Sequence, residues 1–531
     1  MTSISTQKHV CVGAKVAGLA RPLLMVLLLL ATVWLLWFAA DRAIQLLGYP
    51  YPTDTLEGTL LHEARLMRAG APLYQPLEHY SFVSAPYPPL HPLLLALVDL
   101  LVGPHLFWSG RLVSLVAALM VGLMVCLTIR FVTGCWSAGL FATAMLLSAP
   151  PVFIWATRIK PDLFALMWTT GGLAVATWAA SSRGRVANLR LVAAATCFAL
   201  AFLTKQTAVA APLATGVALL IGDLLVWRRR RSAAQGSSQS LPSPQTLLSP
   251  QTLIFGFSYL ILTLGMWFVL DQIYAGQYTV HVWWSGDRVR WWSLGLFLKL
   301  VGLILPYWPL LLLGALGAIV GLYRQRDRIL ACYTLIAPLT LSAAGETGAN
   351  HNHLLETLLA FNLSAGVLIG RHLMLQVAHG IETGWPRLIA GYSLIIALLL
   401  IQGGLLLKPH PWYGSELDPT MRSTPERFVA FMRGTPGEIL ADDPGLLMLA
   451  GKPIRYDDAS TMGPAAAIGK WDQRGLIEDI THQRFSAIML PINVNTETSD
   501  PAGRWSPEVL AAIRQYYTRL YYDEISTYVP R

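Results

Sequence analysis

The stretch PLLMVLLLLATVWLLWFAA, residues 22–40, contains no charged residue and follows the basic residues Lys8, Lys15 and Arg21. A helix of about 20 apolar residues is long enough to cross the hydrocarbon core of a bilayer. A secretory signal peptide begins in the same way, but its apolar core has only about 7–15 residues. Because many more apolar runs follow, the stretch predicts a retained first transmembrane helix.

The composition of the whole chain agrees with this reading. Of its 531 residues, 54% are hydrophobic and only 13% are charged, whereas soluble domains average about 25% charged residues. The sequence therefore predicts an all-α membrane protein with about eleven transmembrane helices. After residues 22–40, the remaining candidates are residues 107–130, 136–154, 163–181, 190–204, 207–227, 252–270, 293–321, 329–343, 354–371 and 386–407.

One shorter apolar run, PLHPLLLALVDLLVG at residues 89–103, fits an interfacial helix in the first outer loop better than a span. If this run is not counted as a span, the basic clusters at residues 228–231 and 324–328 lie on the cytoplasmic side together with the N-terminus. That is the positive-inside arrangement, and it gives the net charge of +9 a role in orientation. The prediction is a bacterial inner-membrane protein with a cytoplasmic N-terminus.

The end of the chain has a different pattern. The segments at residues 437–458 and 483–494 predict short buried strands, and those at residues 471–483 and 506–520 predict helices. Ser506 and Pro507 fit the N-cap and N1 positions of the last helix. We therefore expect a transmembrane domain at residues 1–408 and a small extracytoplasmic α/β domain at residues 409–531. The five cysteines form no paired framework, so no structural disulfide is expected.

The predicted outer face carries carboxylates close to cations. The residues that we select as candidates are Asp54, Glu57, Arg111, Arg158, Lys160, Asp162, Lys205 and Arg290. Cations at a membrane surface can neutralise a phosphate, and a carboxylate can accept a proton from a hydroxyl. This chemistry suits an anionic, lipid-borne substrate. The alternative is that each residue is a solvated or snorkelling side chain of an ordinary surface loop.

Several short motifs occur in order along the first 210 residues: EGTLLHEARLMRAGAPLY, YPPLHPLLLAL, GRLVSL, IKPD and LTKQTA. Together they resemble the GT-C membrane glycosyltransferases that use polyprenyl-phosphate sugars. The nearest group contains the protein O-mannosyltransferases and the aminoarabinose transferases that modify lipid A. The resemblance implies an enzyme whose donor is a polyprenyl-phosphate-linked sugar and whose acceptor is a lipid, protein or glycan, with no nucleic-acid partner.

The resemblance also implies roles for particular residues. In that family an acidic residue of the first outer loop, usually in an Asp-Glu-Gly-like run, acts as catalytic base. Here Leu56 replaces the first acid and Glu57 matches the second, while Asp54 lies three residues earlier. Glu57 is favoured as the base on motif position, with Asp54 second. Asp162 corresponds to a second acid of the family.

These assignments predict an inverting transfer. Glu57 or Asp54 removes the acceptor proton, and Asp162 orients the acceptor or the sugar. The phosphate is held by the basic candidates named above through charge-assisted hydrogen bonds. The sequence indicates no definite cofactor, and a divalent metal is the one alternative.

Two other readings of the sequence remain open. His351, His353 and Glu356 could hold a divalent metal, although His-x-His spacing alone is weak and a polar helix entry explains it better. A transporter or flippase of a lipid-linked glycan is the main functional alternative. Transporters usually contain inverted repeats and broken helices near mid-bilayer, and no such repeat is visible.

Overall fold

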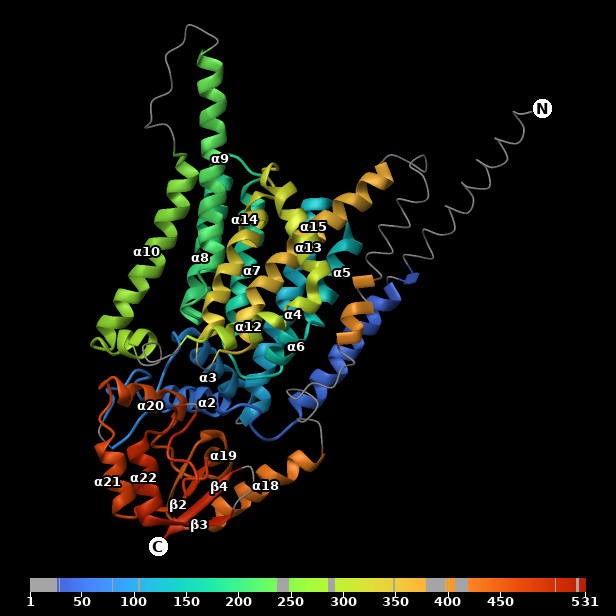
Figure 1. The fold of residues 1–531 in the computed structure, drawn as a ribbon. Coiled ribbons are helices and arrows are strands. Elements are labelled where there is room, and N and C mark those ends of the chain that lie inside the picture. The colour runs from blue at the N-terminus through green and yellow to red at the C-terminus, as the bar shows by residue number, and fades with distance from the viewer. Residues whose placement is uncertain are drawn as a thin grey trace, which may run out of the picture.

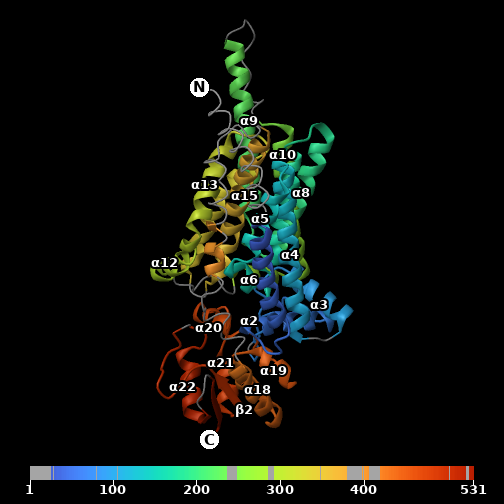
Figure 2. The ribbon, with the colours of Figure 1, turned by 90° about the vertical axis from the view of Figure 1, so that its right-hand side faces the viewer.

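A computed structural model of the chain shows a long helical bundle with a smaller α/β domain at one end (Figures 1 and 2). The structure describes residues 26–27, 29–78, 80–103, 106–235, 248–284, 292–346, 349–378, 397–398, 400–405, 419–501, 503–521 and 525–531. Two short helices, α2 (Thr55–Arg68) and α3 (Leu90–Val102), lie between the bundle and the α/β domain.

The bundle is built from helices whose bounds follow the apolar runs of the sequence. Its first helix is Leu29–Leu47. The others are α4 (Leu106–Thr133), α5 (Trp136–Leu147), α6 (Pro150–Ala156), α7 (Asp162–Ala179), α8 (Gly184–Thr204), α9 (Ala210–Gln235), α10 (Pro250–Ile273), α12 (Leu294–Gly302), α13 (Trp308–Leu322), α14 (Arg328–Ile336) and α15 (Leu355–Ala378). The connecting pieces are α11 (Gln277–Thr279), η2 (Val280–Trp284), η3 (Leu305–Tyr307), η4 (Ala337–Gly345) and η5 (His351–Leu354).

Among the described residues, eight helices are long and apolar enough to cross a membrane, or nine if one bent pair is a single span. The prediction of a multispanning helical protein is thus confirmed, whereas the number of eleven stays a prediction. Helix α7 occupies the segment predicted at residues 163–181 but falls outside this set. Most of the segment predicted at residues 386–407 lies outside the described residues.

The segment predicted as one span at residues 136–154 is bent. Helices α5 and α6 meet at 71°, and α6 starts with Pro150 and Pro151. Proline lacks a backbone N–H and drives the residue before it out of the helical region. Ala149 accordingly has extended φ and ψ angles, −67° and 125°. Two consecutive prolines therefore divide the apolar run.

Helix α3 is the short apolar run of residues 89–103. Its 13 residues correspond to a length of about 20 Å, less than the roughly 30 Å hydrocarbon core. Both views place it beside α2 at the end of the bundle that carries the α/β domain (Figures 1 and 2). This length and position agree with the predicted interfacial helix.

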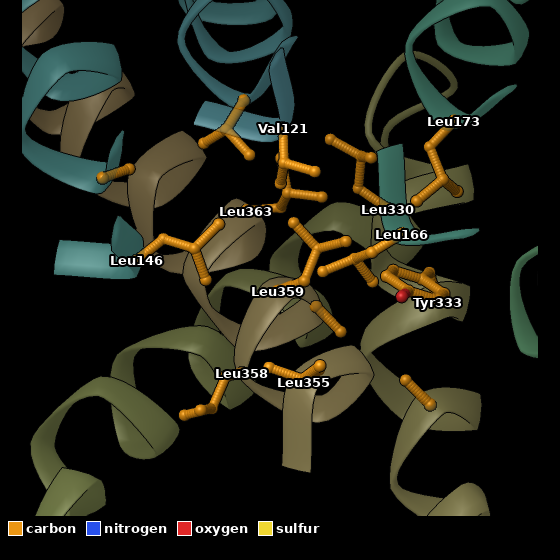
Figure 3. Packing of buried hydrophobic residues seen from close by; sticks show 14 of the residues in the cluster. Val121, Leu146, Leu166, Leu173, Leu330, Tyr333, Leu355, Leu358, Leu359 and Leu363 are labelled. Atoms are coloured by element: carbon orange, nitrogen blue, oxygen red, sulfur yellow. The ribbon is translucent and has the colours of Figure 1, made fainter. Parts of the chain in front are cut away.

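The core of the bundle is organised around α15. Leucines along this helix face residues of several neighbouring helices (Figure 3). The labelled residues are Val121 of α4, Leu146 of α5, Leu166 and Leu173 of α7, Leu330 and Tyr333 of α14, and Leu355, Leu358, Leu359 and Leu363 of α15. In the most apolar stretch of the helical segment His351–Leu375, which includes most of α15, 67% of the residues are buried. The corresponding share for α10 is 17%. Helix α15 is therefore one of the central helices, and α10 is peripheral.

The α/β domain contains a four-stranded sheet of order β1-β2-β4-β3. Its strands are β1 (Glu438–Ala441), β2 (Phe485–Leu490), β3 (Tyr517–Tyr521) and β4 (Ser526–Pro530), and its helices are α18 (Pro419–Gly434), α19 (Pro444–Ala450), α20 (Ala459–Ala467), α21 (Arg474–Thr481) and α22 (Pro507–Tyr516). Strands β1 and β2 are parallel, and the other pairs are antiparallel. The predicted α/β character is correct, but the segment at residues 437–458, predicted as strands, contains the helix α19, which Asp443 caps and Pro444 starts. The boundary at residue 409 lies outside the described residues.

The last predicted helix is correct at its start and too long at its end. Ser506 caps α22 by accepting a hydrogen bond from the Val509 N–H at 3.2 Å, and Pro507 occupies N1. The helix ends at Tyr516, and the following residues YTRLY form β3. Tyrosine and threonine favour strands, and pairing with β4 provides the partner that an isolated sequence does not show.

Candidate active site

Glu57 in the first turn of α2 is completely buried against Arg111 of α4. Arg111 donates from Nε to Oε1 at 3.0 Å and from Nη2 to Oε2 at 2.8 Å. The backbone N–H of Ile159 also donates to Oε1, and the N–H and hydroxyl of Thr53 donate to Oε2. Burial opposes ionisation, but the Arg111 charge and these bonds outweigh it and lower the pKa of Glu57. Both oxygens are therefore already occupied.

Arg111 is likewise bonded to several partners within the protein. Its guanidinium is fully buried and also donates to the carbonyl oxygens of Leu46, Tyr49 and Tyr51. It thus joins the end of the first helix to α2 and α4. A guanidinium with this many fixed protein partners stabilises the fold of the segment at residues 48–103, hereafter the first loop.

Asp54 lies at the N-cap of α2 and is more accessible. It accepts a hydrogen bond from the Leu56 N–H at 2.9 Å, which caps the helix. Its carboxylate also binds Lys160 Nζ at 2.6 Å and lies 3.6 Å from Arg158 Nη1, with 19% of the side chain exposed. Burial opposes ionisation here as well, but Lys160 and Arg158 prevail and lower the pKa of Asp54.

The turn at residues 157–162 connects these groups to the bundle. Its Ile159 N–H holds Glu57, and its Lys160 holds Asp54. Asp162, which begins α7, lies close enough to Lys160 for their charges to interact. The side chain of Lys205, just after α8, binds Asp162 at 2.5 Å. Asp54 and Asp162, two acidic residues selected from the sequence, are therefore connected through Lys160.

A cavity of about 940 Å³ opens next to the Asp162–Lys205 pair. Most of its walls are apolar side chains of α7, α8, α9, α10 and η4. The polar side chains that line it are Asp162, Lys205, Gln206, Thr207, Thr279, Thr340, Ser342, Asn352, His353 and Glu356. The cavity thus has long apolar walls and a small group of polar and charged residues.

The first loop contacts this cavity through Gln206. The Gln206 amide donates to the carbonyl oxygens of Pro86 and Val282 at 3.1 and 3.0 Å. Val282 belongs to η2, whose Trp283 also lines the cavity. Gln206 carried no role in the sequence-based prediction, although it directly follows Lys205 in the LTKQTA motif.

The structure places the predicted residues in three groups. Glu57 and Arg111 form a closed buried pair. Asp54 pairs with the buried Arg158 and Lys160 at the start of α2 and is the partly exposed member of this cluster, and Asp162 and Lys205 line the cavity. Arg290 lies outside the described residues.

The sequence-based prediction did not single out one buried carboxyl, Glu63 on α2. Neither of its oxygens has a hydrogen-bond partner among the residues that the structure describes, and it faces Asp457 and Asp458 of the α/β domain. Burial and these two like charges raise the pKa of Glu63 well above its ordinary value. The signal that could have identified it is the acidic pair in RYDD, but the sequence does not show that this pair reaches α2.

The possible metal ligands do not come together. No group of three His, Cys, Asp or Glu side chains among the residues that the structure covers could hold a metal ion. His351 bonds Asn350 through Nδ1 at 2.7 Å and packs near the Trp155 ring, whereas His353 and Glu356 line the cavity. The predicted trio is thus divided between two environments.

The fold and the site define an integral membrane protein with acidic first-loop residues near a largely apolar cavity. Comparisons with known proteins agree with this class. Residues 86–236 match the sequence family described as dolichyl-phosphate-mannose-protein mannosyltransferase. No curated protein sequence matches the chain.

Solved structures resemble the chain over nearly its full length. ArnT from Cupriavidus metallidurans in the apo state has 13% identity and a TM-score of 0.59, covering 94% of this chain and 98% of that chain. The same protein bound to undecaprenyl phosphate gives 0.58 at the same identity and coverage. The oligosaccharyltransferase AglB from Archaeoglobus fulgidus, in complex with an inhibitory peptide and a dolichol-phosphate, gives 0.53 at 11% identity, covering 94% and 74%. The expected resemblance to the GT-C fold is confirmed.

Proposed function

We propose that the protein is an integral membrane glycosyltransferase that moves a sugar from a polyprenyl-phosphate donor to an acceptor hydroxyl on the extracytoplasmic face. The observation that carries this proposal is the chain of charges Asp54–Lys160…Asp162–Lys205, which ends at the apolar cavity. The match to the mannosyltransferase family over residues 86–236 supports the same reaction class.

The cavity suits a substrate with a lipid tail and a polar head. Its size of about 940 Å³ lies at the upper end of the roughly 300–1,000 Å³ typical of ligand sites. Leu213, Leu264 and Leu339 are among the apolar residues that line it and are exposed at the surface of the bundle. A lipid can therefore enter sideways from the bilayer, while its head group remains near Lys205.

Asp54 is the better base of the two first-loop carboxylates. Glu57 is fully buried and receives five hydrogen bonds, so an acceptor hydroxyl cannot reach a free oxygen. Asp54 is partly exposed and lies beside the two cations of the neighbouring turn. We therefore assign Asp54 as the base and Glu57 as the residue that holds the first loop in place through Arg111.

Substrate binding itself activates this base. In the free protein Lys160 and Arg158 lower the pKa of Asp54, which makes it a weak proton acceptor. A donor phosphate placed beside these two residues competes with Asp54 for them through charge-assisted hydrogen bonds. As their charge is shared, the pKa of Asp54 rises, and the carboxylate becomes able to accept the acceptor proton.

The remaining steps follow from this arrangement. The acceptor oxygen attacks the anomeric carbon while its proton passes to Asp54, and the bond from that carbon to the phosphate oxygen breaks with inversion. The leaving phosphate keeps the bonding electrons and is stabilised by Lys160, Arg158 and Lys205. Asp162 fixes Lys205 and positions it at the cavity.

The test is a transfer assay with purified protein in detergent, using radiolabelled undecaprenyl-phosphate sugars and a membrane extract as acceptor source. We expect Asp54→Asn to lower turnover by about 10²- to 10⁴-fold, because a positioned general base contributes that much. Asp162→Asn should lower it less. Asp472→Asn, at an exposed carboxylate of the α/β domain, is the matched control and should keep wild-type activity.

Two outcomes would contradict the proposal. Wild-type turnover by Asp54→Asn at normal expression would remove Asp54 as the base. Movement of the labelled lipid across liposomes without any cleavage of the sugar–phosphate bond would replace the transferase with the flippase alternative.

A further inference from the structure

The segment ANHNHLLE, residues 349–356, remains unexplained by the proposed reaction. In the structure its residues lie in two different environments. His351 turns away toward Asn350 and the Trp155 ring, whereas Asn352, His353 and Glu356 line the cavity. Asn352 also bonds the side chain of Asp162. One face of this segment therefore forms part of the polar end of the cavity.

Glu356 is held in a fixed orientation. It lies in the first turn of α15, where the helix dipole favours a negative charge. The hydroxyl of the fully buried Tyr333 on α14 donates to its Oε2 at 3.2 Å. An ionisable residue within a membrane span is costly and usually serves a function, and this one is oriented by a neighbouring helix.

The charges around Glu356 argue against a phosphate at this point. Among the described residues that line the cavity, two carboxylates, Asp162 and Glu356, accompany one lysine, Lys205, which is already bound to Asp162. A phosphate beside Glu356 would meet a second acidic group, so it is better placed near Lys160 and Arg158. What a carboxylate in this position can bind is a hydrogen-bond donor such as a hydroxyl.

We infer that Glu356 determines which sugar is transferred, by accepting hydrogen bonds from hydroxyl groups of the glycosyl unit while Tyr333 holds its carboxylate in place. The inference rests on the proposed function, because it requires a glycosyl unit in the cavity. It adds a specificity-determining residue on α15, far in sequence from the first loop and from the turn at residues 157–162. A site built to bond a hydroxyl strongly rejects an analogue that lacks it, because its own buried polar group is then left unpaired.

The test combines changes in the enzyme with changes in the substrate. Wild type, Glu356→Gln and Tyr333→Phe are assayed with undecaprenyl-phosphate-linked glucose, mannose and galactose, and then with monodeoxy analogues of the donor that wild type prefers. Glu356→Gln should lower kcat/KM for that donor by about 10- to 100-fold, the effect of one hydrogen bond to a charged group. Most of the loss should appear in KM, and Tyr333→Phe should show a smaller loss of the same kind.

The deoxy analogues decide whether Glu356 touches the sugar. If it does, removing the contacted hydroxyl lowers kcat/KM of the wild-type enzyme. The same change lowers kcat/KM of Glu356→Gln almost no further, so the two losses are not additive. The undecaprenyl phosphate carrier alone, without a sugar, should raise the melting temperature of Glu356→Gln as much as that of wild type. Glu426→Gln, at an exposed position on α18, is the matched control and should behave as wild type throughout.

Each remaining outcome has a definite meaning. Additive losses for every deoxy position, or loss of the shift caused by undecaprenyl phosphate in Glu356→Gln, would overturn the inference while leaving the proposed function intact. Absence of transfer by wild type with all of the lipid-linked sugars would overturn the proposed function and the inference with it.

Discussion

Asp54 and Glu57 are only three residues apart, and they have different surroundings. The carboxylate of Glu57 is enclosed by Arg111, Thr53 and the Ile159 N–H, whereas Asp54 is partly exposed between a helix N-terminus and Lys160. A buried carboxylate with both oxygens satisfied contributes to the fold, and a partly exposed one can exchange its partners with a substrate. The two roles can be separated by measuring stability and activity in the same variants.

Glu57→Gln is expected to lower the free energy of unfolding by about 3–5 kcal/mol, because it leaves Arg111 buried without its counter-charge. The measurement is the melting temperature of the purified protein in detergent. Asp54→Asn is the comparison variant: asparagine caps a helix as well as aspartate does, and 19% of the Asp54 side chain is exposed, so this variant should lose transfer while its melting temperature falls less than that of Glu57→Gln. A stable but inactive Glu57→Gln, beside an active Asp54→Asn, would reverse the two assignments.

Glu63 makes the stability of the folded protein depend on pH, and the direction of the change follows from its raised pKa. Its pKa is raised in the folded protein, first by burial and then by Asp457 and Asp458. The folded protein therefore keeps a proton that the unfolded chain loses above the ordinary value of 4.5. The stabilisation is complete below that value and is lost as the pH rises through the raised pKa of Glu63.

Replacing Glu63 with glutamine should remove this part of the pH dependence. The wild-type melting temperature is expected to fall as the pH rises from about 5 to about 8, and the Glu63→Gln variant should show a shallower fall. Asp457 also has a raised pKa, so some dependence will persist in the variant. Glu78→Gln, at an exposed position of the first loop, should follow wild type. Identical slopes for wild type and Glu63→Gln would refute a buried, protonated Glu63.

At the scale of single elements, helix α15 is placed by close contact with α13. A Cβ atom added at Gly317 would lie 2.3 Å from the carbonyl oxygen of Ser364, and one at Gly314 would lie 2.7 Å from that of Phe361. Small residues allow membrane helices to approach until their backbones touch. Since α15 carries Glu356 and the core leucines, this contact also positions one wall of the cavity.

Gly317→Ala should therefore destabilise the bundle by about 1–3 kcal/mol, the usual effect of overpacking a well-filled core. Melting temperatures in detergent measure this change, and transfer activity should fall with it as α15 is displaced. Gly256→Ala on α10 is the matched control, because open space surrounds that position. It should be neutral or stabilising by about 0.5–1 kcal/mol. Equal melting temperatures for both variants would show that α13 and α15 do not touch here.

At the scale of the whole molecule, the α/β domain is tied to the first loop. Phe82 and Tyr456 form a parallel bridge, the Thr59 hydroxyl donates to the Asp457 carbonyl oxygen at 2.6 Å, and Gly58 lies against the backbone of Gly445. The domain, α2 and α3 are therefore at one end of the bundle, and α9 with its four arginines projects from the other (Figures 1 and 2).

This arrangement predicts that the two ends lie on opposite faces of the membrane. In a background with all native cysteines replaced, Tyr80→Cys in the first loop and Arg229→Cys on α9 are both at exposed positions. A membrane-impermeant maleimide added outside intact cells should label the cysteine at position 80 and reach that at position 229 only after the membrane is opened. Labelling of both positions in intact cells would disprove the proposed topology.

Local patterns predicted much of the fold. Apolar runs located most of the helices, and the length of residues 89–103 correctly predicted a helix too short to count as a span. The capping pair Ser506–Pro507 located the start of α22. The bend between α5 and α6 follows from Pro150 and Pro151, so it too was present in the sequence, although the apolar run concealed it. Strand β3 could not be recognised in the same way because its partner lies elsewhere in the chain.

The sequence by itself determined that the chain is a helical membrane protein and which charged residues are candidates for its site, because hydropathy and charge are local properties. Only the tertiary structure decided how those side chains are placed: Glu57 and Arg111 enclose each other, Asp54 stays partly exposed, and Glu356 reaches the cavity from another helix. The reason is that burial and pairing depend on contacts between residues distant along the chain. A motif records the spacing of side chains but not the partner that each one meets.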